Sequence, residues 1–245
     1  MKSILKNIFG LFAALVFAVS LIIVIICYFL IFSFFNAVMA PRIAHQYITR
    51  NWAQFLFPAF GIKVKVIGKE LLNRESTYVF IGNHRSLLDV PAYAIATDHT
   101  FRFLAKEELT KIPFMGYIIR KLYISVNRKD KYARAKSMER MQQSIRDGIS
   151  VFICPEGTRN TSDQPLLDFR DGAFRLAIQA QVPLAVMAIT GSDKLLSPKK
   201  SFALSPGKMV CRWAVPIETT GMTSEDVPLL KEKAKLVMME LLKMD

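Results

Sequence analysis

The sequence predicts an α/β fold in which a mixed central sheet is flanked by helices and preceded by a membrane helix or helical hairpin. From residue 62 onward, short apolar runs of strand length alternate with segments of helical periodicity, which is the pattern of α/β domains. Before residue 41, an uncharged apolar run is long enough to cross a bilayer. We therefore expect a membrane anchor with an interfacial connector over residues 1–60 and one globular domain over residues 61–245.

The N-terminal apolar run covers residues 8–40, where no Asp, Glu, Lys or Arg occurs. This is too long for a signal peptide, so we treat it as a retained anchor. About 20 apolar residues span the hydrocarbon core, which leaves two arrangements open: one tilted helix, or two short helices broken near Ser20 or Ser33. Basic residues lie on both sides of the apolar run, and their distribution gives a small preference for a globular domain at the cytoplasmic face of the inner (plasma) membrane.

Seven segments of the domain have the composition of strands. Ile62–Ile67 alternates apolar residues with lysines, which predicts a strand with one buried face. The segment 208–215 alternates in the same way, and we expect it at an edge of the sheet. The other strands are expected at 78–81, 101–105, 122–126, 150–154 and 182–190.

Helices are expected between these strands, and several carry recognisable ends. Asp130 is placed to cap a long helix that Gly148 closes, and Thr223 with Asp226 has the spacing of a capping box. Ser86 and Asp89 have the same spacing. The expected helices are 87–96, 112–121, 131–147, 171–180 and 223–242.

The formal charge of +13 narrows the classes of partner. The sequence contains no recognition helix, zinc finger or repeat of aromatic and basic residues of the kind that binds nucleic acid. An anionic membrane surface and a phosphorylated substrate are therefore the better explanations of the positive charge. Cys27, Cys154 and Cys211 lie far apart without a Cys-x-x-Cys pair, which argues against structural zinc and disulfides. We expect neither a metal nor another cofactor.

His84 is the first candidate for chemistry. It follows a strand end and the turn at Gly82 and Asn83, and Asp89 comes five residues later. Histidine is the side chain best suited to accept a proton near neutral pH, and a carboxylate can fix its tautomer. On one helix the two would point about 140° apart, so the pair requires His84 to precede the helix. The alternative is that Asp89 only caps the helix and His84 has a structural role.

A second candidate is the segment Pro155–Arg159, which follows another strand. Gly157 lets a ligand approach the backbone, and the planar guanidinium of Arg159 suits phosphate. Lys106 and Arg128 also follow strand ends, so these cations could converge with His84 on one edge of the sheet as an anion site. Each charge could instead be a solvated surface residue.

Together these segments resemble the blocks of a known family. The glycerolipid acyltransferase family, and most of all its bacterial 1-acyl-sn-glycerol-3-phosphate acyltransferase branch, has similar blocks in the same order and at about the same spacing. Lys106–Leu109 and Phe169–Phe174 match as well, so the resemblance covers about residues 60–220. Arg85 stands where glutamine is common and Cys154 where phenylalanine is usual. The four blocks are Asn83–Asp89, Arg128, Pro155–Arg159 and Val182–Leu184.

The resemblance implies a glycerol-phosphate acyltransferase-like fold for residues 61–245 and a specific reaction. A fatty acyl group would pass from acyl-CoA or acyl-carrier protein to the sn-2 hydroxyl of 1-acyl-sn-glycerol 3-phosphate, giving phosphatidic acid. His84 would be the general base and Asp89 its partner. The acceptor would be bound by Glu156, Gly157, Thr158 and Arg159, with Lys106 and Arg128 on its phosphate.

The expected mechanism is direct transfer of the acyl group from the thioester to the acceptor hydroxyl, without a covalent acyl-enzyme. Backbone N–H groups from Arg85 to Leu87 are expected to stabilise the oxyanion, since helix N-termini favour negative charge. We interpret Ser86 as a cap and not as a nucleophile. Two alternatives stay open: another acceptor, such as a different lysophospholipid, a lyso-aminolipid or glycerol 3-phosphate, or a non-catalytic membrane protein that binds lipids.

Overall fold

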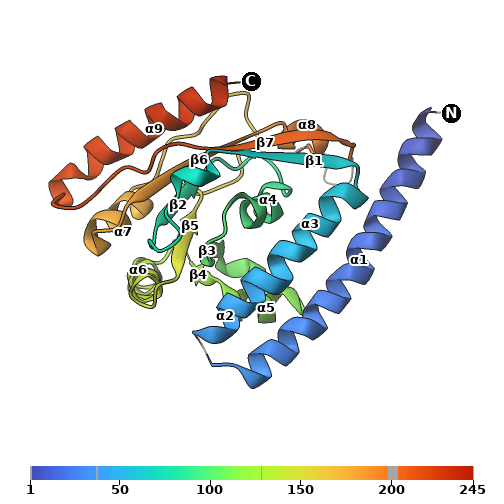
Figure 1. Ribbon diagram of the computed structural model, residues 1–245, viewed down its shortest axis with the longest axis horizontal. Helices are drawn as coiled ribbons and strands as arrows, with labels where there is room; N and C mark the ends of the chain where they lie inside the picture. The colour runs from blue at the N-terminus through green and yellow to red at the C-terminus, as the bar shows by residue number, and fades with distance from the viewer. Residues whose placement is uncertain (1, 37, 128, 198–203, 245) are drawn as a thin grey trace.

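The computed structural model describes residues 2–36, 38–127, 129–197 and 204–244. Within these residues one seven-stranded sheet forms the centre of the domain, with strand order β1-β7-β6-β2-β5-β3-β4 (Figure 1). Neighbouring strands are parallel except β6 and β7, which are antiparallel, so the sheet is mixed as predicted. The strands are β1 Ile62–Ile67, β2 Val79–Gly82, β3 Phe101–Lys106, β4 Ile124–Val126, β5 Ser150–Ile153, β6 Leu184–Thr190 and β7 Gly207–Trp213.

The position of β7 corrects one prediction. We expected this strand at an edge, but it lies between β1 and β6, and β1 is the edge strand on that side of the sheet. The alternating pattern arises because Met209, Cys211 and Trp213 face the core while the intervening residues are more accessible. Alternation therefore reports that one face of the strand is covered, and it does not report whether a neighbour pairs with each side.

Helices cover both faces of the sheet and make it the middle of three layers (Figure 1). On one face α3 and α4 pack over an aromatic core, and on the other α6, α7 and α9 pack over Val and Ile side chains of β2 and β5. The helices of these layers are α3 Arg50–Ala59, α4 Asp89–Ala96, α5 Met115–Leu122, α6 Lys131–Arg146, α7 Gly172–Ala180, α8 Ser192–Leu195 and α9 Val227–Lys243.

Two of the predicted helix starts are confirmed by their caps. The Asp130 carboxylate accepts a hydrogen bond from the backbone N–H of Tyr132 at the start of α6. Thr223 and Asp226 form the predicted capping box, which opens a short 3-10 turn, Ser224–Asp226, that leads into α9. Helix α5 begins at Met115, later than predicted, because the 3-10 turn Glu107–Lys111 and a tight turn at Phe114 precede it.

The N-terminal anchor contains one long helix, α1 Lys2–Phe34. The helix continues through Ser20 and Ser33, where the sequence left a break open, and the hydroxyls of these serines donate to the carbonyl groups of Phe17 and Phe29. Among the described residues one helical segment, Phe9–Phe34, is long and apolar enough to cross a membrane. The chain then turns back after Phe34, so two antiparallel helical segments form the N-terminal part.

The returning segment joins this anchor to the domain. It consists of α2 Met39–Ile43, a π-helical turn Ala44–Thr49 and α3, which lies beside α1 (Figure 1). The Trp52 indole of α3 donates a 2.9 Å hydrogen bond to the Ser20 hydroxyl, and its ring packs against Phe17. Because α3 also packs on α4 and β1, the long apolar helix is fixed to the domain and is not a free tail.

Candidate active site

The site lies where four parallel strands end. Strands β2, β5, β3 and β4 are neighbours and run in the same direction, so their carboxyl ends meet at one edge of the sheet. The segments that follow β2 and β5 therefore start side by side, as the pairing of Ile81 with Ile153 requires. Lys106, the last residue of β3, lies at the same edge. The predicted convergence of strand ends is thus present in the fold.

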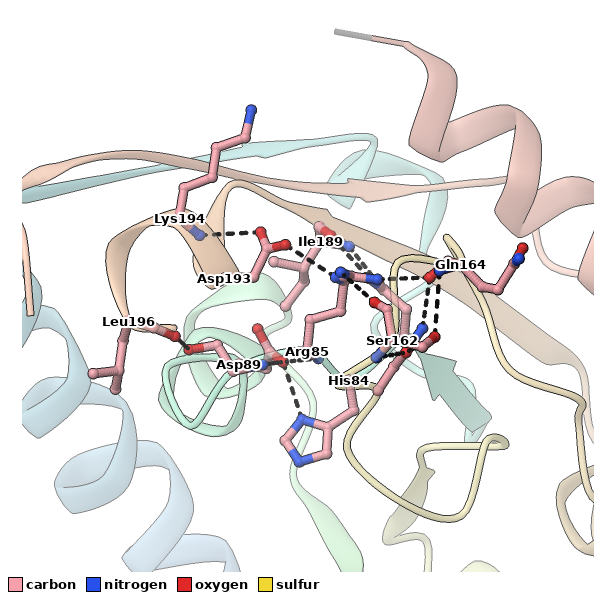
Figure 2. Close-up of polar contacts among 12 residues, drawn as sticks. His84, Arg85, Asp89, Ser162, Gln164, Ile189, Asp193, Lys194 and Leu196 are labelled. Carbon is pink, nitrogen blue, oxygen red and sulfur yellow. Dashed lines mark hydrogen bonds and ion pairs between the residues drawn. The ribbon is translucent and has the colours of Figure 1, made fainter. Parts of the chain in front are cut away.

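His84 and Asp89 are in direct contact. The Nδ1 atom of His84 lies 3.0 Å from Oδ2 of Asp89, and the other ring nitrogen, Nε2, points away from the carboxylate (Figure 2). The Asp89 side chain is 1% exposed, whereas that of His84 is 19% exposed. A carboxylate in this position holds the proton on Nδ1 and leaves Nε2 as the basic atom, directed toward the accessible side.

Asp89 also organises the backbone of the loop before α4. Its Oδ2 atom accepts hydrogen bonds of 2.7 Å from the N–H groups of both Arg85 and Ser86. The helix begins at Asp89 because these bonds fold residues 85–88 into a turn ahead of it. They also correct the expected oxyanion site: of the three predicted donors, Arg85 and Ser86 are bonded to Asp89, which leaves Leu87.

Glu156 fixes the backbone of His84 from the neighbouring strand. Its Oε1 accepts a 3.0 Å bond from the His84 N–H, and its Oε2 accepts a 2.8 Å bond from the N–H of Leu167. The N–H of Asn160 in turn donates to the His84 carbonyl at 2.7 Å. Burial raises the pKa of the Glu156 carboxyl, and the two backbone bonds oppose this shift. The turn after β5 therefore holds His84 by both of its backbone groups.

The remaining predicted site residues that the structure describes are partly or fully exposed. Gly157 has φ of +75°, a conformation that favours glycine, and Thr158 is exposed. The half-buried guanidinium of Arg159 makes no hydrogen bond or ion pair with any residue that the structure describes. The Lys106 ammonium is 3.2 Å from the Glu108 carboxylate, and both side chains are more than half exposed. The Arg128 prediction lies outside the described residues.

Asn83 is a positioning residue that sequence reasoning saw only as part of a turn. Its buried amide pairs with the backbone of Ile189 in β6, accepting from the N–H at 2.7 Å and donating to the carbonyl at 2.9 Å. The Tyr93 hydroxyl donates to the Asn83 carbonyl at 2.5 Å. Through these bonds the Asn83 side chain continues the pairing of β2 with β6 beyond the end of β2. They also fix the direction of the chain at His84.

Arg85 ties the same loop to two other segments (Figure 2). Its Nε donates to the Asp193 carboxylate at 3.0 Å, and its two terminal nitrogens donate to the carbonyl groups of Gln164 and Ser162. The sequence signalled the side chain at this position only as a departure from the common glutamine. Its partners lie 77 to 108 residues further along the chain, so no local pattern could reveal them.

Comparisons with known proteins match this chain to acyltransferases. The family model described as Acyltransferase matches residues 63–190, just over half of the chain. A Saccharomyces cerevisiae protein named 1-acyl-sn-glycerol-3-phosphate acyltransferase is 29% identical over 188 residues, which cover 75% of this chain and 61% of the relative. A Haemophilus influenzae protein of the same name is 28% identical, with 74% of each chain covered.

A solved structure covers almost the whole chain. The crystal structure of the 1-acyl-sn-glycerophosphate (LPA) acyltransferase PlsC from Thermotoga maritima matches with a TM-score of 0.79 and 25% identity, covering 98% of this chain and 95% of that one. The resemblance first drawn from short blocks is confirmed, and so is the predicted fold. Because the family model matches more than half of the chain, including His84, Asp89 and the turn after β5, the protein belongs to the acyltransferase family.

Proposed function

We propose that this membrane acyltransferase is a 1-acylglycerol-3-phosphate O-acyltransferase. It transfers a fatty acyl group from a thioester, acyl-CoA or acyl-carrier protein, to the sn-2 hydroxyl of 1-acyl-sn-glycerol 3-phosphate and forms phosphatidic acid. The observation that carries the proposal is the His84–Asp89 contact, with Nε2 facing the accessible side at the strand-end edge that also carries Arg159. The names of the relatives support the choice of acceptor.

In the proposed reaction His84 acts as a general base. Its Nε2 takes the proton of the acceptor hydroxyl while the oxygen attacks the thioester carbonyl, and Asp89 stabilises the imidazolium that forms. The tetrahedral intermediate then expels the thiolate, and the imidazolium returns the proton to that sulfur. Ser86 is not available as a nucleophile, since its hydroxyl donates to the Leu196 carbonyl at 2.9 Å. The reaction needs no cofactor.

The acceptor phosphate is assigned to the cations at this edge. Arg159 is the best placed of the described cations, because its planar fork suits phosphate and no described side chain competes for it. Lys106 adds charge from the end of β3, and Arg128 keeps the role that the resemblance gave it. Gly157 and Thr158 border the acceptor, whereas Glu156 acts indirectly, because its two oxygens hold the backbone.

The proposed location is the cytoplasmic face of the inner (plasma) membrane. The helical segment Phe9–Phe34, in a chain of this family, indicates a membrane protein. Acyl-CoA and acyl-carrier protein are soluble donors, and the acceptor is a lipid, so the reaction must take place where the two phases meet. The formal charge of +13 suits attachment to an anionic surface.

The test is His84→Ala in the purified full-length protein, assayed with both thioester donors and a panel of lysolipid and glycerol 3-phosphate acceptors. We expect acyl transfer to fall by about 10³-fold, the usual contribution of a general base, while lysolipid binding is retained. His99→Gln is the matched control, because His99 precedes β3 at the opposite edge and its Nε2 contacts the Asn73 carbonyl. Unchanged activity in His84→Ala would overturn the assignment of His84 as the general base, and no acyl transfer by the wild type with any donor and acceptor would favour the non-catalytic lipid-binding protein.

A further inference from the structure

The segment between β3 and α5 exposes apolar side chains beside the active site. Leu109, Ile112 and Phe114 are 41%, 47% and 71% exposed, and all three belong to one short connection. The connection starts directly after Lys106, at the edge of the sheet where His84 lies. Single exposed apolar residues are ordinary, but a group of them on one connection indicates a surface that is covered by a partner.

The backbone of this segment is folded in a way that presents Phe114 outward. Phe114 has φ of +61° and ψ of −52°, and the Met115 N–H donates to the Pro113 carbonyl at 2.6 Å, which together define a classic γ-turn. This conformation is strained for a residue with a side chain. A Cβ atom on Gly116 would lie 2.0 Å from the Thr110 carbonyl oxygen, so the segment closes tightly on itself. The exposed ring is therefore held in place by a built turn.

The same segment is continuous with the membrane helix. Helix α5 begins immediately after Phe114, and its Tyr117 ring lies 6.2 Å from the rings of both Phe29 and Phe32 in α1. Figure 1 shows α5 beside the C-terminal half of α1. Phe29 belongs to the segment Phe9–Phe34 and is itself 59% exposed. The exposed residues thus extend the apolar surface of the anchor toward the catalytic edge.

Basic residues surround the apolar group. Lys106, Lys111, Arg120 and Lys121 are all exposed, and against them stand Glu107 and Glu108, of which Glu108 is paired with Lys106. Apolar tips bordered by basic residues are typical of segments that lie at a membrane interface and contact anionic headgroups.

We propose that Leu109, Ile112 and Phe114 insert into the headgroup region of the anionic bilayer that holds α1. These three residues are called the docking tip below. Insertion of the docking tip brings the carboxyl ends of β2, β3 and β5 to the membrane surface, so that a lipid acceptor reaches His84 without leaving the bilayer. An acidic carrier protein would also suit the basic residues, but the direct contact of α5 with α1 favours the membrane.

The test places a fluorescent residue at the docking tip of the full-length protein. Phe114→Trp is reconstituted in phosphatidylglycerol vesicles whose acyl chains carry bromine, and its emission is read as the difference from the wild type, which contains Trp52 and Trp213. We expect an approximately twofold loss of the added emission, because interfacial apolar residues sit ~5–10 Å into the headgroup boundary. Ile112→Trp provides a second probe that leaves the γ-turn unchanged.

The matched control is Leu236→Trp, an exposed apolar position on α9, which covers the opposite face of the sheet (Figure 1). The emission of the tryptophan added at position 236 should be insensitive to bromine in the lipid and sensitive to iodide in the water. The proposal is wrong if both docking-tip probes behave like this control, or if they are shielded only after acyl-carrier protein is added. The readout does not use acyl transfer, so its failure is distinct from failure of the proposed activity.

Discussion

Two regions of the molecule each contain a buried or half-buried histidine, and they give the imidazole opposite properties. His84 lies in the loop after β2, with one nitrogen on the Asp89 carboxylate and a side chain that is 19% exposed. His45 lies in the π-helical turn Ala44–Thr49 and is 4% exposed, with its ring edge-on to Phe101. No described residue bonds to Nε2 of His45.

The difference lies in what each region offers to a positive charge. Burial, followed by the nearby Arg50 guanidinium, lowers the pKa of His45 to about 3, so this ring stays neutral. His84 instead has a carboxylate that stabilises the imidazolium and an accessible nitrogen through which a proton can enter. A histidine becomes a candidate base through its neighbours, and the residue type alone does not decide it.

The largest effect is expected for Asp89→Asn, which removes the charge from the His84 region and keeps the shape. The amide oxygen can still accept from the N–H groups of Arg85 and Ser86, but it cannot stabilise the imidazolium. We expect kcat to fall by about 10³-fold, as for loss of His84 itself, with little change in the KM of the acceptor. Steady-state kinetics of the purified protein measure both. Asp168→Asn is the control, because that side chain is fully exposed. A kcat within twofold of the wild type would mean that Asp89 is only a cap.

A smaller effect on catalysis is expected for Arg159→Ala. This substitution tests whether the two histidine regions also differ in having an arginine that no described residue pairs with. Arg50, beside His45, is ion-paired with Asp98, whereas Arg159 makes no such contact with a described residue. Loss of a charged hydrogen bond to phosphate should raise the acceptor KM by about 10- to 100-fold and change kcat less. Lys106→Ala should raise it less, since Lys106 is exposed and paired with Glu108. Equal effects of the two substitutions would contradict the assignment of Arg159.

The sequence predicted the elements of the site better than their partners. Strand ends, caps and the pairing of His84 with Asp89 depend on residues close together in the chain, and short-range patterns report them. Long-range contacts leave no such pattern. Glu156 bonds to a backbone N–H 72 residues away, and Asn83 to one 106 residues away. The internal position of β7 and the unbroken course of α1 follow from packing against β1 and α3, which local composition does not encode.

The smallest effect on activity is expected for His45→Leu, which removes the buried imidazole. Activity should be unchanged, but stability should depend differently on pH. The folded-state pKa of about 3 lies below the unfolded value of 6.5, so below pH 6.5 the unfolded chain binds a proton that the folded protein does not. The unfolding free energy of the wild type, relative to His45→Leu, should therefore fall by ~1.4 kcal/mol for each pH unit of acidification below 6.5. Thermal unfolding of both detergent-solubilised proteins from about pH 8 to about pH 5 measures this difference, and His99 cancels because it is present in both. Parallel stability curves would show that His45 is protonated in the folded protein and that burial alone does not separate the two histidines.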